Sequence, residues 1–183
     1  EEIKITNGNF RKKRRQLMKK VDFNLNERVA LITGAGTGIG KAIAICLAQY
    51  GAKICVHYHS SQKQAEQTLS EIKDTGSDGI LIQADISNEK QADSIVDAAI
   101  SRFGRLDILV NNAGSPIKKS RIEECSVELW KSVFDVNMTG AFIITKKAIP
   151  HLKKTGNAAI VNIVSLSIQT GGANGSGPYA AAK

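Results

Sequence analysis

The sequence has no long hydrophobic run. None of its apolar stretches approaches the roughly 20 residues that a helix needs to cross a bilayer. The first residues are polar and basic, without the apolar region that follows in a secretory signal peptide. We therefore expect a cytoplasmic protein with no membrane partner.

Cysteine is scarce as well. Cys46, Cys55 and Cys125 are odd in number and widely spaced, which argues against a disulfide framework. Cys55, His57 and His59 alternate along one face of a predicted strand, and such side chains can ligate a metal. That strand is of a type buried among helices, however, and no fourth ligand is evident. We expect no metal site.

What is present is an ordinary composition for one globular domain: 183 residues, 42% hydrophobic and 23% charged. The net charge of +8 is uneven, because residues 1–20 hold eight basic and two acidic side chains, a net of +6. No aromatic residues interleave with the basic run 11–15, so we expect a solvated arm and consider nucleic-acid binding unlikely. We assign residues 1–24 to a flexible basic arm and residues 25–183 to one folded domain.

Beyond the arm, apolar runs alternate with helical patterns. Fully apolar strands separated by helices predict an α/β fold with a parallel sheet covered on both faces. Strands are predicted over residues 28–33, 53–57, 80–84, 106–110 and 158–164, and helices over residues 39–50, 61–74, 88–103 and 127–154, the last with a break near residues 136–137.

Local signals refine the helices. Ser87 is a possible N-cap of the third helix, and Gly104 follows its end. On the first helix, an apolar stripe is predicted from Ile39, Ile43, Cys46, Leu47 and Tyr50.

Between the first strand and the first helix lies a glycine-rich loop, Thr33-Gly34-Ala-Gly-Thr-Gly38-Ile39-Gly40. A pyrophosphate at such a junction meets helix N–H groups and the positive end of the helix dipole. Glycines also serve tight turns without any ligand. Four glycines within seven residues at a strand-to-helix junction favour the phosphate site.

The last residues contain Tyr179 and Lys183 four positions apart, after Pro178 and among alanines that favour a helix. Spacing of four places both side chains on one helix face. A cation beside a phenol favours the phenolate, which makes the tyrosine usable as a general acid and base. Alone, this pair occurs by chance on many helices.

Together with Asn111-Asn112-Ala113-Gly114 after the fourth strand, these motifs resemble the short-chain dehydrogenase/reductase family over residues 25–183. The resemblance is nearest to 3-oxoacyl-carrier-protein reductases and glucose-dehydrogenase-like members. It implies a Rossmann-type doubly wound sheet of strand order 3-2-1-4-5-6-7 and an NAD or NADP cofactor. It also implies a homo-oligomer, a tetramer or a dimer.

The resemblance further implies a catalytic set. Tyr179 matches the acid/base that protonates the carbonyl oxygen, and Lys183 matches the residue that assists the tyrosine and binds the nicotinamide ribose. Ser165 matches the hydroxyl that orients the substrate carbonyl, with Ser167 as a rival because the gap to Tyr179 is one residue longer than expected. Asn137 matches the residue that kinks its helix and holds a water leading to the lysine.

The cofactor-binding positions carried over in the same way come from the glycine loop, the ends of strands two to four, and the catalytic helix. They are Gly34, Thr37, Gly38, Ile39, Gly40, Tyr58, Ser60, Asp85, Ile86, Asn112, Ala113, Gly114, Tyr179 and Lys183.

The end of the second strand bears on the choice of cofactor. Enzymes that prefer NAD usually carry an acidic residue there, which binds the ribose 2′-hydroxyl. Residues 57–63 contain no acid; they offer the hydroxyls of Tyr58 and Ser60 and the cation of Lys63. We expect NADP, with NAD possible because the usual arginine is also missing.

The sequence therefore predicts an NADP-dependent oxidoreductase that transfers a hydride between the cofactor and a ketone or secondary alcohol, including a 3-oxoacyl thioester. One alternative is an NAD-linked sugar or polyol dehydrogenase. Another is a catalytically silent module that senses NADP(H). Because Lys183 would stand in the first turn of a helix that the chemistry needs rigid, we also expect the natural chain to continue to about 250 residues, a common single-domain size for this fold.

Overall fold

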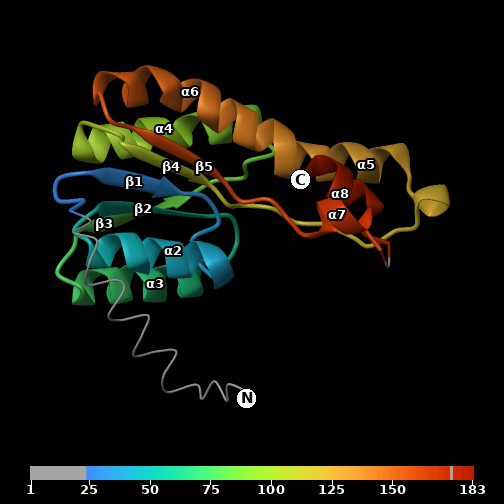
Figure 1. The fold of residues 1–183 in the computed structure, drawn as a ribbon, viewed down its shortest axis with the longest axis horizontal. Coiled ribbons are helices and arrows are strands. Elements are labelled where there is room, and N and C mark those ends of the chain that lie inside the picture. The colour runs from blue at the N-terminus through green and yellow to red at the C-terminus, as the bar shows by residue number, and fades with distance from the viewer. Residues whose placement is uncertain (1–23, 174) are drawn as a thin grey trace, which may run out of the picture.

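A computed structural model of the chain describes residues 24–173 and 175–183, so all but the last residue of the expected basic arm lies outside the described part. The described chain forms a five-stranded parallel sheet between two layers of helices (Figure 1). The strand order is β3-β2-β1-β4-β5. The strands are β1 (Val29–Ile32), β2 (Lys53–Tyr58), β3 (Gly79–Gln83), β4 (Ile108–Asn111) and β5 (Ala159–Asn162).

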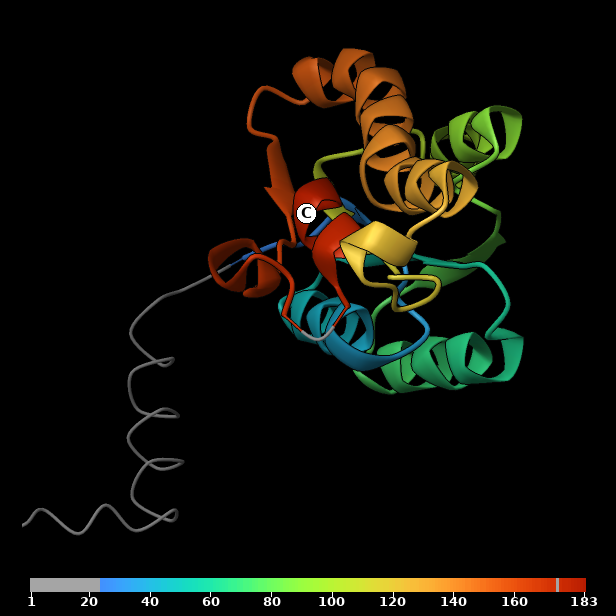
Figure 2. The same cartoon turned by 90° about the vertical axis from the view of Figure 1, so that its right-hand side faces the viewer.

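Helices cover the two faces in sequence order, as a doubly wound fold requires. One layer holds α2 (Gly38–Gln49) and α3 (Gln62–Asp74), and the other holds α4 (Glu89–Phe103) and α6 (Gly140–Lys154) (Figure 1). Shorter elements gather beyond one end of the sheet, where α8 lies beside α5 (Figure 2). These are η1 (Ile122–Glu124), α5 (Val127–Phe134), η2 (Asp135–Thr139), α7 (Ser167–Thr170) and α8 (Gly177–Ala182). In the described ranges, no helix has both the length and the apolar character to cross a membrane.

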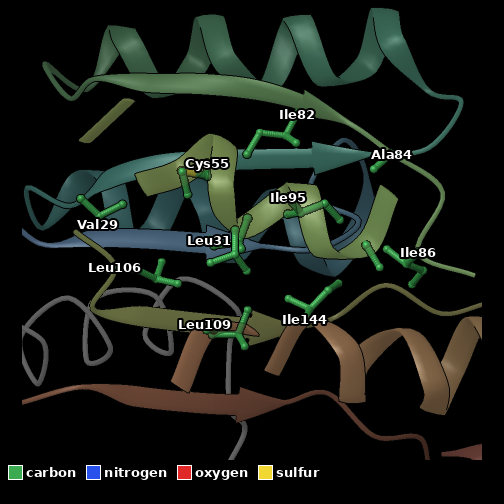
Figure 3. Close-up of a cluster of buried hydrophobic side chains, with 14 of the residues drawn as sticks. Val29, Leu31, Cys55, Ile82, Ala84, Ile86, Ile95, Leu106, Leu109 and Ile144 are labelled. Atoms are coloured by element: carbon green, nitrogen blue, oxygen red, sulfur yellow. The ribbon is translucent and has the colours of Figure 1, made fainter. Parts of the chain in front are cut away.

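Alternation of side chains along the strands divides the core into two clusters. Leu31, Cys55 and Leu109 point toward α4 and α6, where they pack against Ile95 and Ile144 (Figure 3). Their strand neighbours, including Ile32, Val56 and Val110, pack toward α2 and α3. Both faces of the central strands are therefore apolar, which explains the continuous apolar runs in the sequence. The predicted doubly wound sheet is confirmed.

The apolar stripe predicted for α2 is confirmed only in part: Ile43 and Leu47 are partly buried and pack against the core, but other members of the stripe are exposed. Ile39 is 63% exposed and Cys46 is exposed, whereas the buried positions of this helix are Gly40, Ala44 and Ala48. Small residues bury here because the helix lies close to β1 and β2, and larger side chains would hold it away from the sheet. The fully buried positions of α2 are therefore occupied by small residues.

The caps of α4 are partly as predicted. Gly104 ends the helix in the left-handed conformation, with φ of 72°, and donates its N–H to the carbonyl of Ile100. The N-cap is Asn88, whose side chain accepts from the N–H of Gln91, and not Ser87. Ser87 instead donates both its N–H and its hydroxyl to Asp85.

The strand β5 departs from the expected pattern. It pairs only with β4 among the described residues, and all four of its residues are exposed, with Ile160 at 40% and Val161 at 44%. The coverage on both faces expected for the sheet in general is therefore not found at β5, which is an exposed apolar edge of the sheet in the described residues.

The predicted break in the helix over residues 127–154 is confirmed. Between α5 and α6, residues Asp135–Thr139 form one widened π turn, and Asn137 lies buried inside it. Such widened turns are often found at functional sites. The chain continues directly from this turn into α6, so the break is a local widening of the helix.

Candidate active site

The carboxyl ends of the strands open into one cleft with a volume of about 860 Å³. Open parallel sheets bind ligands at this end, outside the point where the strand order reverses. Nearly every position singled out in the sequence lines the cleft: Gly34, Thr37, Gly38, Ile39, Tyr58, Ser60, Asp85, Ile86, Asn112, Ala113, Gly114, Ser165, Tyr179 and Lys183. Gly40 and Asn137 are not among the residues that line it.

The glycine loop brings the N-terminus of α2 to the cleft. Thr37, the N-cap, makes no capping side-chain hydrogen bond, and the first turn holds no acidic residue. Gly38 has φ of 55°, and a Cβ added there would meet nothing within 4 Å, so its exposed face is turned toward open space. A Cβ added at Gly40 would overlap the carbonyl oxygen of Gly34. The helix amides and dipole are therefore presented to an anion.

The loop is tied to its neighbours on two sides. Asn112 Nδ2 donates to the carbonyl oxygens of Thr33 at 2.8 Å and Gly34 at 3.2 Å. Thr33 Oγ1 in turn accepts from the backbone N–H of Asn112, at 3.0 Å. On the far side, Thr68 of α3 donates to the carbonyl of Gly36 at 3.1 Å. The ends of β1 and β4 thus form one hydrogen-bonded unit.

The end of β2 contributes a buried histidine. His57 is 1% exposed, and its two ring nitrogens lie 3.1 Å from the N–H of Gly34 and 3.1 Å from the carbonyl oxygen of Ala84. Burial lowers the pKa of His57 to about 4, so the ring is neutral at pH 7. Because both nitrogens are bonded to backbone groups, the Cys55, His57 and His59 set offers no histidine nitrogen from His57 to a metal.

At the β3 end of the cleft, Asp85 is held by Ser87. Hydrogen bonds from the Ser87 hydroxyl at 2.7 Å and from its N–H at 2.9 Å lower the pKa of Asp85 and fix its carboxylate. His59, which is largely exposed, has Nε2 3.9 Å from Asp85 Oδ2. Tyr58 is buried apart from the part that lines the cleft.

Tyr179 and Lys183 reach the cleft from α8. The helix contains Tyr179, and Lys183 follows as its C-cap. Lys183 Nζ lies 6.0 Å from the centroid of the Tyr179 ring. Burial lowers the pKa of Lys183. The predicted placement of both side chains on one face of a helix is confirmed.

Ser165 and Ser167 form a contact of their own. Ser165 lines the cleft, whereas Ser167 starts α7 behind it. Their hydroxyl oxygens are 2.8 Å apart, and the N–H of Ser167 donates to Ser165 Oγ at 3.2 Å. The geometry therefore favours Ser165 as the group that meets a ligand, with Ser167 supporting it.

Asn137 joins the π turn to the loop after β4. Its Nδ2 donates to the carbonyl oxygens of Ser115 at 2.7 Å and Val133 at 2.8 Å, and its Oδ1 accepts from the N–H of Ser115 at 3.1 Å. A Cβ added at Gly114 would lie 2.6 Å from Asn137 Oδ1 and 3.0 Å from Lys183 Nζ. The side chains of Asn137 and Lys183 therefore both reach Gly114.

Several residues of the site are not predicted by the sequence motifs. His57 stands there only as a possible metal ligand, and Ser115 belongs to none of the motifs. The cleft also takes part of its wall from Ile163, Val164 and Leu166, which follow β5. No sequence pattern announces these residues; only their position just after a strand end, where parallel strands bring side chains together, could have suggested them.

The arrangement combines an anion site at a helix N-terminus with a phenol, a hydroxyl and an ammonium in the same cleft. The first suits the phosphates of a dinucleotide, and the others suit proton transfer to a carbonyl oxygen. The open space beside Gly38 is what the phosphate group needs. The residues present therefore fit a nicotinamide dinucleotide.

Comparison with known proteins agrees with this chemistry. The family described as short chain dehydrogenase matches residues 28–183, and the chain belongs to it. It is 37% identical to the 3-oxoacyl-[acyl-carrier-protein] reductase of Synechocystis sp., over 87% of this chain and 64% of that protein. It is also 37% identical to glucose 1-dehydrogenase 2 of Bacillus subtilis, over 80% of this chain and 57% of that protein.

Among solved structures, the chain is similar to an NADH-dependent reductase, A1-R′, complexed with NAD. The TM-score is 0.84 at 34% identity, and the match covers 89% of this chain and 70% of that one. The chain spans 57–64% of the length of the two curated relatives above. The family and the Rossmann-type fold follow from these matches.

Proposed function

We propose that this protein is an NADP-dependent oxidoreductase that transfers a hydride between a nicotinamide cofactor and a ketone or secondary alcohol. The observation that carries the proposal is the convergence of Tyr179, Lys183 and Ser165 on the cleft that also holds the glycine loop. A proton donor beside a dinucleotide site is what reduction of a carbonyl requires.

In the proposed mechanism, a bound cofactor supplies or accepts the hydride. The Tyr179 phenol gives its proton to the carbonyl oxygen during reduction and takes it back during alcohol oxidation. The ammonium of Lys183 favours the phenolate that remains, because it lies near the ring. Ser165 donates a hydrogen bond to the same carbonyl oxygen and orients it for the transfer.

Asn137 is assigned a positioning role. It fixes the loop containing Gly114 and Ser115, above which Lys183 Nζ ends. The glycine loop would hold the cofactor phosphates through Thr37, Gly38 and Ile39 at the N-terminus of α2. Asp85 and Ile86 would border the adenine, and Asn112 to Gly114 would follow the cofactor toward the catalytic residues.

One observation favours NADP as the cofactor, and another favours NAD. No carboxylate stands among residues 57–63, and Tyr58, Ser60 and Ser61 bring hydroxyls to this end of the cleft, which favours the 2′-phosphate of NADP. The structural relative complexed with NAD is described as NADH-dependent. We retain NADP as the proposal and NAD as the alternative.

The substrate class is proposed from the relatives. A 3-oxoacyl thioester is one candidate, since a relative is named as a 3-oxoacyl-[acyl-carrier-protein] reductase. A sugar or polyol with an NAD-linked reaction is the second, since another is named as a glucose 1-dehydrogenase. Assembly as a tetramer or dimer and a cytoplasmic location stay predictions.

The substitution Tyr179→Phe tests the reaction in the complete protein. Loss of the acid should cut turnover by about 10²–10⁴-fold, the usual value of general acid–base catalysis, while NADPH affinity stays nearly unchanged. Tyr50→Phe, the same change in a residue that lies outside the cleft at the end of α2, is the matched control and should leave turnover within about twofold.

Steady-state turnover on a panel of β-keto esters, sugars and diketones, with NADPH and with NADH, gives the measurement. A Tyr179→Phe protein that keeps a tenth of the activity would remove Tyr179 from the role of acid. Tight NADPH binding with no turnover of any carbonyl would favour a silent NADP(H)-sensing module.

A further inference from the structure

We infer that His57 is a positioning residue for the phosphate-binding loop, and that its neutral imidazole holds the N–H of Gly34 in place from the end of β2. The inference rests on the proposed dinucleotide site and adds to it a residue that none of the cofactor-binding motifs contains. His57 contributes to cofactor binding through Gly34, and its imidazole does this in the Nε2–H tautomer.

The tautomer follows from the two partners of the ring. The N–H of Gly34 can only donate, so Nδ1, at 3.1 Å, must be the unprotonated nitrogen that accepts. The carbonyl oxygen of Ala84 can only accept, so Nε2, also at 3.1 Å, must carry the proton. The ring bridges the loop after β1 to the end of β3, and neither the other tautomer nor a charged ring could make both bonds.

The backbone of the same residue binds the next loop amide. Ala35 donates its N–H to the carbonyl oxygen of His57 at 2.8 Å. Two consecutive amides of the loop are therefore bound by one residue of β2. The carbonyl of Gly34 is held from the opposite side by Asn112 Nδ2 at 3.2 Å. The N–H and the carbonyl of Gly34 are thus each bound by a side chain, His57 for the N–H and Asn112 for the carbonyl.

Burial makes the imidazole hard to replace. At 1% exposure there is little access for water to take over its bonds, so removing the ring leaves the Gly34 N–H and the Ala84 carbonyl without their partner. A loop released at Gly34 can shift the helix amides that follow it, and phosphate binding depends on the placement of those amides. Loss of one such hydrogen bond is typically worth about a tenfold change in an equilibrium constant.

The first test needs no cofactor. Nitrogen-15 NMR of the ligand-free protein at pH 7 should show His57 neutral, with a proton on Nε2 that exchanges slowly with water. The amide proton of Gly34 should also be protected from exchange in the unsubstituted protein and become faster in His57→Leu. A proton on Nδ1, or a charged ring at pH 7, would overturn the inference.

The second test measures binding. His57→Leu, which can make neither bond, should raise the Kd for NADPH about tenfold, while kcat at saturating NADPH stays within about twofold. His57→Gln carries both an acceptor and a donor on a flexible side chain and should recover most of the affinity. This rescue separates a hydrogen-bonding role from simple space filling.

Val56→Ala is the matched control, because Val56 is a buried neighbour on the same strand whose side chain packs into the opposite layer toward α2 and α3. It should lower the melting temperature but leave the Kd within about twofold. Equal affinity for NADPH in a folded His57→Leu protein would refute the positioning role. If His57→Leu does not fold, the NMR test decides alone: a ring proton on Nδ1 of the unsubstituted protein, or one that exchanges rapidly with water, refutes the positioning role.

The proposed function and the role of His57 are refuted by different results. An unsubstituted protein that binds neither NADPH nor NADH would end the proposed function, while the NMR result would still decide the tautomer and the Gly34 contact. Cofactor binding that ignores His57 would end this inference and leave the proposed function intact.

Discussion

At the scale of the residue, the buried ring of His57 links the site to the stability of the fold. In an unfolded chain a histidine takes up its proton near pH 6.5, whereas burial holds the pKa of folded His57 at about 4. Between these values the unfolded chain binds a proton that the folded chain does not, so stability falls as the pH falls. Above about pH 6.5 neither state binds it, and this contribution to the pH dependence is absent.

We therefore predict an acid-side slope that belongs to His57. Its limit is about 1.4 kcal/mol of unfolding free energy per pH unit, reached well below pH 6.5. The charged groups that act on the ring are His59, which opposes protonation, and Asp85, which favours it. Urea unfolding at pH 7, 6 and 5 should show a steeper loss for the unsubstituted protein than for His57→Gln. Parallel losses in the two proteins would contradict the prediction.

The exposed neighbour His59 belongs to the choice of cofactor. It lies at the end of β2, beside Asp85, where the ribose of a dinucleotide would be bound. A carboxylate placed there repels a 2′-phosphate and accepts a hydrogen bond from a 2′-hydroxyl. His59→Asp should therefore reverse or erase a preference for NADPH over NADH.

Fluorescence titrations of both cofactors measure that change. His59→Asn, which removes the imidazole without adding charge, separates the effect of the carboxylate from the loss of the ring. An unsubstituted protein that prefers NADH would contradict the assignment of NADP from the residues that follow β2.

At the scale of the element, the approach of α2 to the sheet depends on Gly40. A Cβ at this position would overlap the carbonyl oxygen of Gly34, lie 2.5 Å from Asn112 Nδ2 and lie 3.0 Å from Ala35 Cα. Backbone atoms cannot yield as a flexible side chain does, so the loop or the helix must shift. Gly40→Ala should therefore weaken NADPH binding by at least about tenfold, although alanine is the better helix former.

Ala42→Gly is the matched control for this prediction. It exchanges the same two residue types on the exposed face of the same helix and should cost about 1 kcal/mol of stability with no change in Kd. Isothermal titration and thermal melts on both variants give the comparison. Gly40→Ala binding NADPH as tightly as the unsubstituted protein would show that α2 tolerates the added methyl group.

The elements were predictable from the sequence where burial on two faces leaves a continuous apolar run, as in β1, β2 and β4. The prediction failed where packing depends on a neighbour's shape. The buried face of α2 consists of Gly40, Ala44 and Ala48, which a hydrophobicity pattern ranks below Ile39. Likewise, the N-cap fell on Asn88 and not Ser87, because Asp85 had already engaged the serine.

The candidate site was predictable to the extent that it consists of motifs with fixed spacing. Tyr179 lies on α8 and Lys183 follows four residues later as its C-cap, so their proximity follows from the sequence. The contacts of His57 with Gly34 and Ala84 join three separate strand ends, and no local pattern encodes them. Their existence depends on the register of a sheet whose strand order the sequence implied only through resemblance.

At the scale of the whole molecule, the cleft gathers residues that follow all five strands, from the glycine loop after β1 to Ile163 after β5. A ligand bound there touches both helical layers through the loops that join them. Anything that binds the folded chain and not the unfolded one stabilises the entire cooperative unit, by about 2.7 kcal/mol at a ligand concentration of 100 times Kd. Binding at this cleft should consequently protect the molecule as a whole.

We therefore predict that NADPH at 100 times its Kd raises the melting temperature by roughly 5–10 °C, from typical values of 2–4 °C per kcal/mol for a chain of this size. Tyr179→Phe should show nearly the same rise at the same NADPH concentration, because the ring stays in the cleft and only the oxygen assigned to proton transfer is removed. Thermal melts over a series of NADPH concentrations, followed by circular dichroism and by intrinsic fluorescence, provide the measurement. A melting temperature that does not rise at saturating NADPH would mean that the cleft is not where the cofactor binds. Transitions that separate between the two probes as NADPH is added would mean that the two helical layers do not unfold together.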